Sequence, residues 1–331
     1  MSKEDFDLTY YADVQSRAIN WLWYPYIPYG KITIVQGDPG EGKTTFVLSL
    51  LSIISKGQAF PGSDVSVSGK AIYQNAEDDN SDTIKPRLEM HEANCANICF
   101  IDKDSGIISL DGNELEKAVR QTQAKILVLD PIQSFLGENV DMNRANSIRP
   151  RLTRLKEIAE RTGCAVILVG HLNKNSGGKA NYRGLGSIDI SAAARSVLVI
   201  GRPADNPDIR VMAQQKNNLG PIGTSMAFAI QNGKVEWLGD YGLSASELLS
   251  GSGTDSESGK LLSARMLLQE LLKDGEMPFN ELANIAAEED IGKRTLRTAK
   301  ASLKVESVKK GDAWYWRLPT NQENRGDSNE K

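Results

Sequence analysis

The amino-acid sequence predicts an α/β fold, in which helices cover a mostly parallel sheet and a small second domain follows. The first observation is an alternation of short apolar runs with helix-like stretches up to Gly201. The second is a glycine-rich loop between the first of these runs and the first helical stretch. The third is a closer spacing of apolar runs after Gly201, with turns such as Asn232-Gly233, which predicts an antiparallel extension of the sheet.

The predicted strands are short aliphatic runs bounded by polar or glycine-containing segments. In the parallel part they cover residues 31–35, 70–74, 98–101, 126–129, 165–169 and 197–200. Helix-like stretches cover residues 45–55, 82–91, 114–123 and 148–161. The antiparallel extension comprises residues 209–214, 225–231 and 234–238. Parallel strands need long crossover connections, and these helices supply them.

Composition narrows the class of protein. The 331 residues are 40% apolar and 25% charged, which is typical of a globular protein with room for one large and one small domain. No apolar run is long enough to cross a membrane, and no signal-peptide pattern opens the chain, so we expect a cytoplasmic protein without a membrane partner. The formal net charge is −4, so any nucleic-acid surface must be local. Three cysteines without zinc spacing and only two histidines argue against a transition-metal site held by the protein.

Residues 37–44 read GDPGEGKT and fit the phosphate-loop pattern G-x-x-x-x-G-K-[ST] at every fixed position. Glycines let the backbone wrap an anion, and loop N–H groups and the helix N-terminus then face the phosphates. We expect Lys43 to reach the β- and γ-phosphates of ATP and the Thr44 hydroxyl to ligate Mg²⁺. The predicted nucleotide-binding residues are Gly37, Asp38, Pro39, Gly40, Glu41, Gly42, Lys43, Thr44 and Thr45. The alternative is a glycine-rich turn that binds nothing.

Carboxylates follow two of the predicted strands. Asp130 ends the run KILVLD and is the candidate second Mg²⁺ ligand, because ligands bind at the carboxyl edge of a parallel sheet. The alternative is an aspartate that starts the turn before Pro131. Glu77 follows the second strand and is the candidate that activates the attacking water. Asp78 and Asp79 compete for that role, and the alternative is a cluster that caps the helix over residues 82–91.

His171 follows the predicted strand over residues 165–169, at a place where a polar side chain can contact the γ-phosphate. The loop that follows, NKNSGGKANYRGLG, carries Lys174, Lys179 and Arg183 and no acidic residue. It is either a solvated surface loop or a mobile loop that contacts DNA phosphates and is coupled to the nucleotide through His171.

The sequence after residue 241 predicts a second domain. Residues 242–260 are rich in glycine, serine and acidic residues and are expected to form a flexible linker after a first domain of residues 1–241. Residues 261–318 show three helical stretches and two short strands, a pattern typical of a winged helix-turn-helix. The polar tail of residues 319–331 is expected to be disordered.

Basic residues dominate the end of this second domain. Between Ile291 and Arg317 there are eight basic and two acidic residues. Such a stripe suits duplex phosphates, with a helix in the major groove, and the alternative is a winged helix that binds protein. The DNA-binding candidates in this domain are Lys293, Arg294, Arg297 and Lys300.

The ordered segments GDPGEGKTT, AEDD, ILVLDPIQSF, DMNRANSIRP and GHLNK resemble the RecA-like P-loop ATPases of the RepA type. This family includes hexameric replicative helicases of plasmids and relatives in phages and integrated elements. The resemblance covers roughly residues 12–240 and includes the upstream segment WLWYPYIPYG. It implies a RecA-like core, assembly into a ring such as a hexamer, and nucleotide at subunit interfaces. It also implies phosphate and Mg²⁺ roles for Lys43 and Thr44, and roles for Glu77 in catalysis, Asp130 in Mg²⁺ binding and His171 as a sensor.

The resemblance also implies a residue that acts in trans, on the neighbouring subunit's nucleotide. Arg195 is at the matching place, although its separation from Arg183 is slightly longer than in the plasmid helicases, and Lys216 is a second candidate. The alternative for Arg195 is an arginine that binds the carbonyls at a helix C-terminus.

These features together predict an Mg²⁺-dependent ATPase that drives a motor on DNA, similar to a ring-forming replicative helicase of a mobile element. Its expected partners are single- or double-stranded DNA, further copies of itself, and primase or other replication proteins. Two alternatives are a recombination or repair ATPase similar to RecA and RadA, and a nucleotide-switched DNA-binding regulator without motor activity.

Overall fold

The computed structural model describes residues 8–102, 108–137, 140, 144–172, 188–204, 206–250, 257–289, 291–311 and 313–319. Within these ranges, no helix is both long and apolar enough to cross a bilayer.

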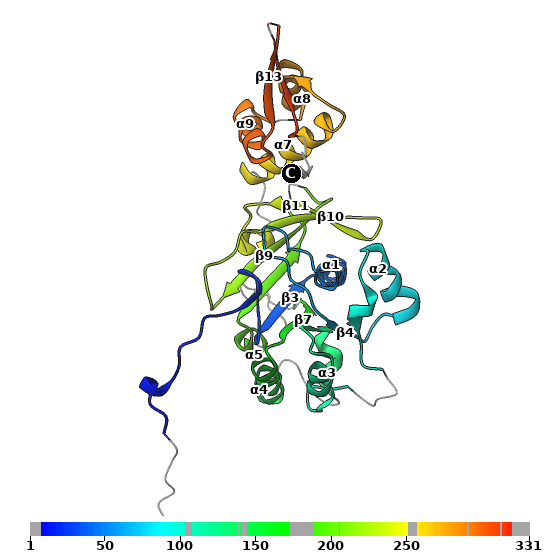
Figure 1. Cartoon of the computed structure of the whole chain (residues 1–331), viewed down its shortest axis with the longest axis vertical. Coiled ribbons are helices and arrows are strands. Elements are labelled where there is room, and N and C mark those ends of the chain that lie inside the picture. The colour runs from blue at the N-terminus through cyan, green and yellow to red at the C-terminus, as the bar shows by residue number, and fades with distance from the viewer. Residues whose placement is uncertain are drawn as a thin grey trace, which may run out of the picture.

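The body of the protein is a nine-stranded sheet in the order β11-β10-β9-β8-β3-β7-β6-β4-β5 (Figure 1). The parallel strands are β3 (Ile32–Gly37), β4 (Ala71–Asn75), β5 (Ile98–Cys99), β6 (Ile126–Asp130), β7 (Ala165–His171) and β8 (Ser196–Gly201). Strands β9 (Arg210–Asn217), β10 (Met226–Gln231) and β11 (Lys234–Asp240) add to β8 in antiparallel fashion. The predicted α/β fold with a mostly parallel sheet is confirmed, and each predicted strand is present.

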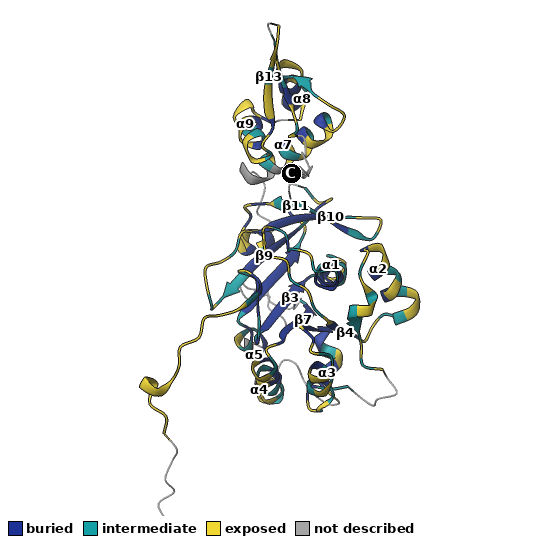
Figure 2. Ribbon diagram, in the orientation of Figure 1, coloured by how far each residue is buried: buried dark blue, intermediate teal, exposed yellow. Residues whose placement is uncertain are grey.

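Helices cover both faces of this sheet. Because side chains alternate between the two faces of a sheet, a buried strand contributes side chains to an apolar cluster on each face. One cluster joins the sheet to α1 (Lys43–Lys56) and α2 (Lys85–Met90), and the other joins it to α3 (Glu114–Thr122), α4 (Ala145–Thr162) and α5 (Ile188–Ala193). The central strands β3, β4, β6, β7 and β8 are accordingly buried over most of their length, whereas the edge strands β5 and β11 are not (Figure 2).

A short hairpin precedes the phosphate-loop strand and was not predicted from the sequence. It consists of β1 (Trp21–Trp23) and β2 (Ile27–Pro28). The Trp23 ring is buried, stacks on Phe60 at 5.2 Å and donates a hydrogen bond from Nε1 to the Pro61 carbonyl at 3.1 Å. Residues 8–20, which include a 3₁₀ turn at Tyr11–Asp13, lead away from the body and are exposed (Figure 1).

The C-terminal unit consists of three helices and a three-stranded antiparallel sheet in the order β12-β14-β13. Its elements are α7 (Glu257–Leu272), β12 (Met277–Pro278), α8 (Phe279–Glu288), α9 (Lys293–Ser302), β13 (Glu306–Lys310) and β14 (Ala313–Arg317). The unit has an apolar core of its own, separate from the clusters of the large sheet.

The prediction of a flexible linker over residues 242–260 is wrong for residues 245–250, which form α6 (Ala245–Ser250). Ser244 and Glu247 make a reciprocal capping box: the Glu247 carboxylate accepts from the Ser244 N–H at 2.8 Å, and the Ser244 hydroxyl accepts from the Glu247 N–H at 3.3 Å. Ala245 and Leu248 are buried against the sheet extension. The linker was predicted because residues 242–260 are rich in glycine and serine, although the capping pattern was present in the sequence. Residues 251–256 lie outside the described residues.

Candidate nucleotide site

The phosphate loop joins β3 to α1 and depends on glycine at three positions. Gly40 and Gly42 have φ angles of 81° and 83°, a left-handed conformation that favours glycine. At Gly37 a β-carbon would lie 2.2 Å from the Ile200 carbonyl oxygen, so only glycine fits where the loop passes the end of β8. The loop therefore wraps tightly at the N-terminus of α1, where backbone N–H groups are available to an anion.

Lys43 lies inside this loop and is almost completely buried. Its Nζ atom donates to the carbonyls of Gly37 at 3.1 Å and Asp38 at 2.8 Å. Burial lowers the pKa of Lys43, and the carboxylates of Asp130 and Glu41 oppose that shift. The geometry holds an ammonium group at the mouth of the loop, where a terminal phosphate can replace the two carbonyls as its partner.

Asp130 ends β6 beside the phosphate loop, as the sequence predicted. Its Oδ2 atom accepts hydrogen bonds from the Thr44 hydroxyl at 2.9 Å and from the Tyr73 hydroxyl at 2.8 Å. Burial raises the pKa of Asp130, while these two hydrogen bonds act in the opposite direction. Thr44 and Asp130 thus place two oxygen atoms next to each other, which is the ligand chemistry that Mg²⁺ prefers.

Tyr73 was not identified from the sequence. It lies on β4, which is paired with β6, so its side chain reaches Asp130 across the strand pair. Burial and the Asp130 carboxylate raise the pKa of Tyr73 well above its ordinary value, so the phenol remains a hydrogen-bond donor. The only signal in the sequence was a hydroxyl group within the predicted strand over residues 70–74.

The three acidic residues after β4 have different surroundings. Asp78 forms an ion pair with Arg87 at 2.9 Å. Asp79 caps the next helical turn by accepting from the backbone N–H groups of Ser81 and Asp82. Glu77 is exposed, and its charge acts on Lys43, Asp130 and His171. The capping alternative therefore applies to Asp79, whereas the charge of Glu77 acts on the residues around the phosphate loop.

His171 lies at the end of β7, in register with Gly37 at the start of the phosphate loop. Its Nδ1 atom is buried and has no hydrogen-bond partner among the described residues. Burial and the charge of Lys43 lower the pKa of His171, which favours the neutral ring. Such an orphaned polar atom beside the loop fits a site that a phosphate oxygen or water completes. The next predicted residues, Lys174, Lys179 and Arg183, lie outside the described residues.

The two candidates for action in trans lie at the opposite edge of the sheet. The Arg195 N–H bonds to the Ile32 carbonyl at the start of β3, and strand geometry puts this point about 17 Å from Gly37. Lys216 donates to the carbonyls of Ser191 and Ala194. Lys216, and not Arg195, is therefore the residue that binds the carbonyls at the end of α5. Neither residue is placed to reach the nucleotide of its own subunit.

Two further arginines border the phosphate loop and were missed in the sequence. Arg202, just after β8, lies 3.5 Å from the Glu41 carboxylate. Arg210, at the start of β9, lies next to Gly42, and its Nε atom is buried without a hydrogen-bond partner among the described residues. Both depend on the antiparallel strand order, which local sequence does not specify.

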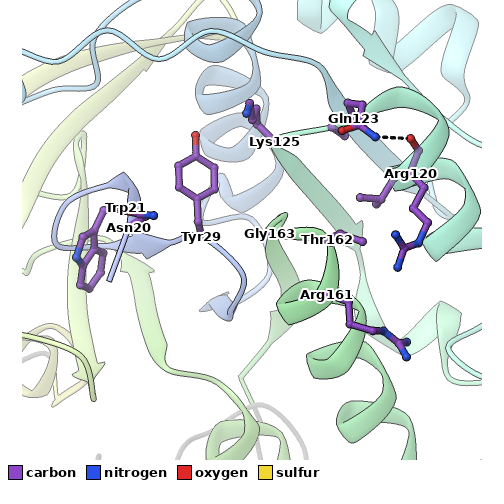
Figure 3. A pocket seen from close by; sticks show the side chains of 11 residues that line it. Asn20, Trp21, Tyr29, Arg120, Gln123, Lys125, Arg161, Thr162 and Gly163 are labelled. Atoms are coloured by element: carbon purple, nitrogen blue, oxygen red, sulfur yellow. Dashed lines mark hydrogen bonds between the residues drawn. The ribbon is translucent and has the colours of Figure 1, made fainter. Parts of the chain in front are cut away.

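A separate cavity of about 680 Å³ lies at the amino edge of the sheet (Figure 3). The side chains of Trp21, Tyr29, Arg120, Lys125 and Arg161 line it. Its two arginines are already paired with Glu116. Because ligands of parallel α/β sheets bind at the carboxyl edge, we do not assign the nucleotide to this cavity.

The four predicted DNA contacts of the C-terminal unit lie on α9. Lys293, Arg294 and Arg297 are exposed. Lys300 is half-buried and donates to the Ser307 hydroxyl at 2.6 Å, so it also ties α9 to β13.

Residues 4–177 match the family described as AAA domain (AAA_25), which is more than half of the chain. The chain belongs to this AAA domain family. The matched segment contains the phosphate loop, Glu77, Asp130 and His171. In the sheet, β7 separates the phosphate-loop strand β3 from β6, and β8 flanks β3 on its other side. Family and fold together make the protein a RecA-like P-loop ATPase.

Two known proteins are similar to this AAA domain protein. DNA repair protein RadA of Pseudomonas aeruginosa is 24% identical over 149 residues, which are 44% of this chain and 28% of RadA. The chain thus spans little more than a quarter of that relative's length. The crystal structure of a KaiC-like protein from Pyrococcus horikoshii OT3 matches with a TM-score of 0.47 and 19% identity, over 64% of this chain and 90% of the other.

Proposed function

We propose that this AAA domain protein is an Mg²⁺-dependent ATPase that drives a ring-shaped motor on DNA, similar to the replicative helicases of the RepA type. The observation that carries the proposal is the convergence of Lys43, Thr44, Asp130 and Glu77 at the carboxyl edge of the sheet. Hydrolysis of a nucleoside triphosphate needs a cation on the terminal phosphates, oxygen ligands for Mg²⁺ and a base for water. This group of side chains supplies all three.

Each residue has one role in this proposal. Lys43 leaves the carbonyls of Gly37 and Asp38 and binds the β- and γ-phosphates. Thr44 and Asp130 hold Mg²⁺, which neutralises charge on the phosphates when bound. Glu77 accepts the proton of the attacking water. His171 contacts the γ-phosphate side of the site and passes its state to the loop that follows β7.

Tyr73 is proposed to position Asp130. Tyr73→Phe removes a single hydrogen bond to a metal ligand, so the Mg²⁺ concentration for half-maximal turnover should rise about 10- to 100-fold. Titration of ATPase activity with Mg²⁺ measures this shift. Tyr29→Phe, at the opposite edge of the sheet, is the matched control and should leave the titration unchanged. Identical titrations for Tyr73→Phe and wild type would contradict the positioning role.

Arg195 is proposed to complete the neighbour's site in a ring, proposed as a hexamer. Its place about 17 Å from its own phosphate loop leaves action in trans as the route to a nucleotide. Arg195→Ala alone should lose about 10³- to 10⁵-fold in turnover. Mixed with Lys43→Ala subunits it should recover part of that activity, because some interfaces then combine an intact loop with an intact arginine.

Lys216→Ala serves as the comparison in the same mixing experiment. Lys216 is engaged by two carbonyls at the end of α5, so we expect its loss to destabilise α5 without rescue in mixed rings. Rescue of Lys216→Ala, and none of Arg195→Ala despite confirmed co-assembly, would reverse the assignment.

DNA is proposed to bind at two places. The first is the basic loop with Lys174, Lys179 and Arg183, coupled to ATP through His171. The second is the C-terminal unit, whose helices and small sheet we interpret as a winged helix with α9 facing DNA. Replication proteins such as a primase are proposed as partners of the assembled ring.

Deletion of residues 251–331 should separate these two places. Because the C-terminal unit has its own core, basal ATPase should persist while duplex binding weakens, and the salt slope should fall by about 0.9 for each lost phosphate contact. Replacing the three loop cations should instead lower DNA-stimulated ATPase. Binding isotherms at several salt concentrations measure both effects. Unchanged duplex affinity after the deletion would make the C-terminal unit a protein-docking module.

A recombination or repair ATPase is the second candidate, favoured by the similarity to RadA. Electron microscopy with single-stranded DNA and a non-hydrolysable ATP analogue separates the two. Closed rings support the motor, and continuous filaments support the repair function.

A further inference from the structure

The C-terminal unit contains a groove of about 570 Å³ between α9 and its small sheet. Three rings, Phe279, Trp314 and Trp316, and three cations, Arg297, Lys300 and Lys304, line it. No carboxylate lines this groove within the described part of the chain.

The two tryptophans of the groove differ in exposure although they share one face of β14. They are two residues apart on the strand, so their side chains point the same way. Trp316 is 5% exposed and packs on Phe279 at 4.9 Å between ring centroids. Trp314 is 53% exposed. Trp316 therefore closes the core of the unit, whereas Trp314 leaves a ring available at the groove.

The cations of the groove also divide into two kinds. Lys300 is held by the Ser307 hydroxyl and lies 5.0 Å from the centroid of the Trp316 ring. The side chains of Arg297 and Lys304 are exposed and make no hydrogen bond or ion pair with any described residue. The axis of α9 from Lys293 to Ser302 is about 14 Å long, and Lys304 lies just beyond its C-terminal end, so exposed cations are spread along the helix. A row of that length suits an extended polyanion better than a small anion.

Resting on the proposed DNA function, we propose that this groove binds single-stranded nucleic acid, with a base stacked on Trp314 and the flanking phosphates on Arg297 and Lys304. An exposed aromatic ring beside unpaired cations is the arrangement that binds single strands without sequence preference. In a duplex the bases are already stacked on each other, so the same ring has no base face to meet. The groove thus distinguishes an unpaired strand from the duplex beside it.

The experiment measures binding by full-length protein without nucleotide, so that it does not depend on hydrolysis. Three labelled ligands are compared by fluorescence anisotropy: a twelve-nucleotide oligothymidine, an abasic strand of equal length and a duplex of equal length. Trp314→Ala should weaken oligothymidine binding about 10- to 100-fold with the salt slope unchanged, and should leave the abasic strand within about twofold. Trp314→Phe should retain most of the affinity.

Arg297→Ala is the complementary variant. It should weaken the oligothymidine and the abasic strand alike and reduce the salt slope by about 0.7. All variants are made in a chain whose three loop cations, Lys174, Lys179 and Arg183, are alanine, so that the loop does not mask the groove.

Equal losses on oligothymidine and the abasic strand in Trp314→Ala, or no loss on either, would overturn the stacking site. Duplex binding that persists in that case leaves the proposed DNA function standing. If a base stacks on Trp314 but the protein hydrolyses no ATP, the proposed binding site in the groove stands and the proposed motor is refuted.

Discussion

Lys43→Ala is expected to abolish ATP hydrolysis. The Lys43 Nζ atom lies within the phosphate loop, hydrogen-bonded to Gly37 and Asp38, and alanine removes this positive charge from the terminal phosphates. Phosphate release at saturating ATP and Mg²⁺ measures the effect.

Lys31→Ala is the matched control for this variant. Lys31 precedes the other end of β3 and pairs with Glu160 on the surface, so the substitution removes the same charge far from the loop. Its turnover should equal that of wild type. Thermal unfolding of both variants separates a lost function from a lost fold. Wild-type turnover by the folded Lys43→Ala variant would contradict the assignment of the nucleotide site.

Glu77→Gln is expected to bind ATP and to hydrolyse it about 10²- to 10⁴-fold more slowly. Glutamine keeps the size and hydrogen bonding of the side chain but accepts no proton from water. Nucleotide affinity and single-turnover hydrolysis, measured on the same preparation, distinguish binding from chemistry.

Asp78→Asn provides the comparison for the catalytic carboxylate. Asp78 is neutralised by Arg87, so its loss should loosen the segment after β4 and leave the chemical step in place. A crippled Asp78→Asn beside an active Glu77→Gln would show that the wrong carboxylate was chosen.

The parts of the fold that the sequence predicted are those specified by local pattern. Aliphatic runs indicated the parallel strands. The glycine spacing indicated the phosphate loop, because the left-handed backbone conformation at Gly40 and Gly42 favours glycine. The carboxylates Asp130 and Glu77 followed from the rule that strand ends meet at one edge.

The residues that the sequence did not predict depend on which strands become neighbours. Tyr73 reaches Asp130 only because β4 pairs with β6, and Arg210 reaches Gly42 only through the antiparallel extension. Helix α6 is a different case: its capping box was present in the sequence, but composition outweighed it. The sequence likewise does not distinguish Trp314 from Trp316. Tertiary packing buries Trp316 and leaves Trp314 exposed.

Unwinding of a forked DNA duplex tests the central claim most directly. We expect the wild-type protein to separate the strands in a reaction that requires both ATP and Mg²⁺, and we expect Glu77→Gln not to separate them. A protein that hydrolyses ATP in response to DNA and assembles on it, yet leaves the fork paired, would contradict the motor.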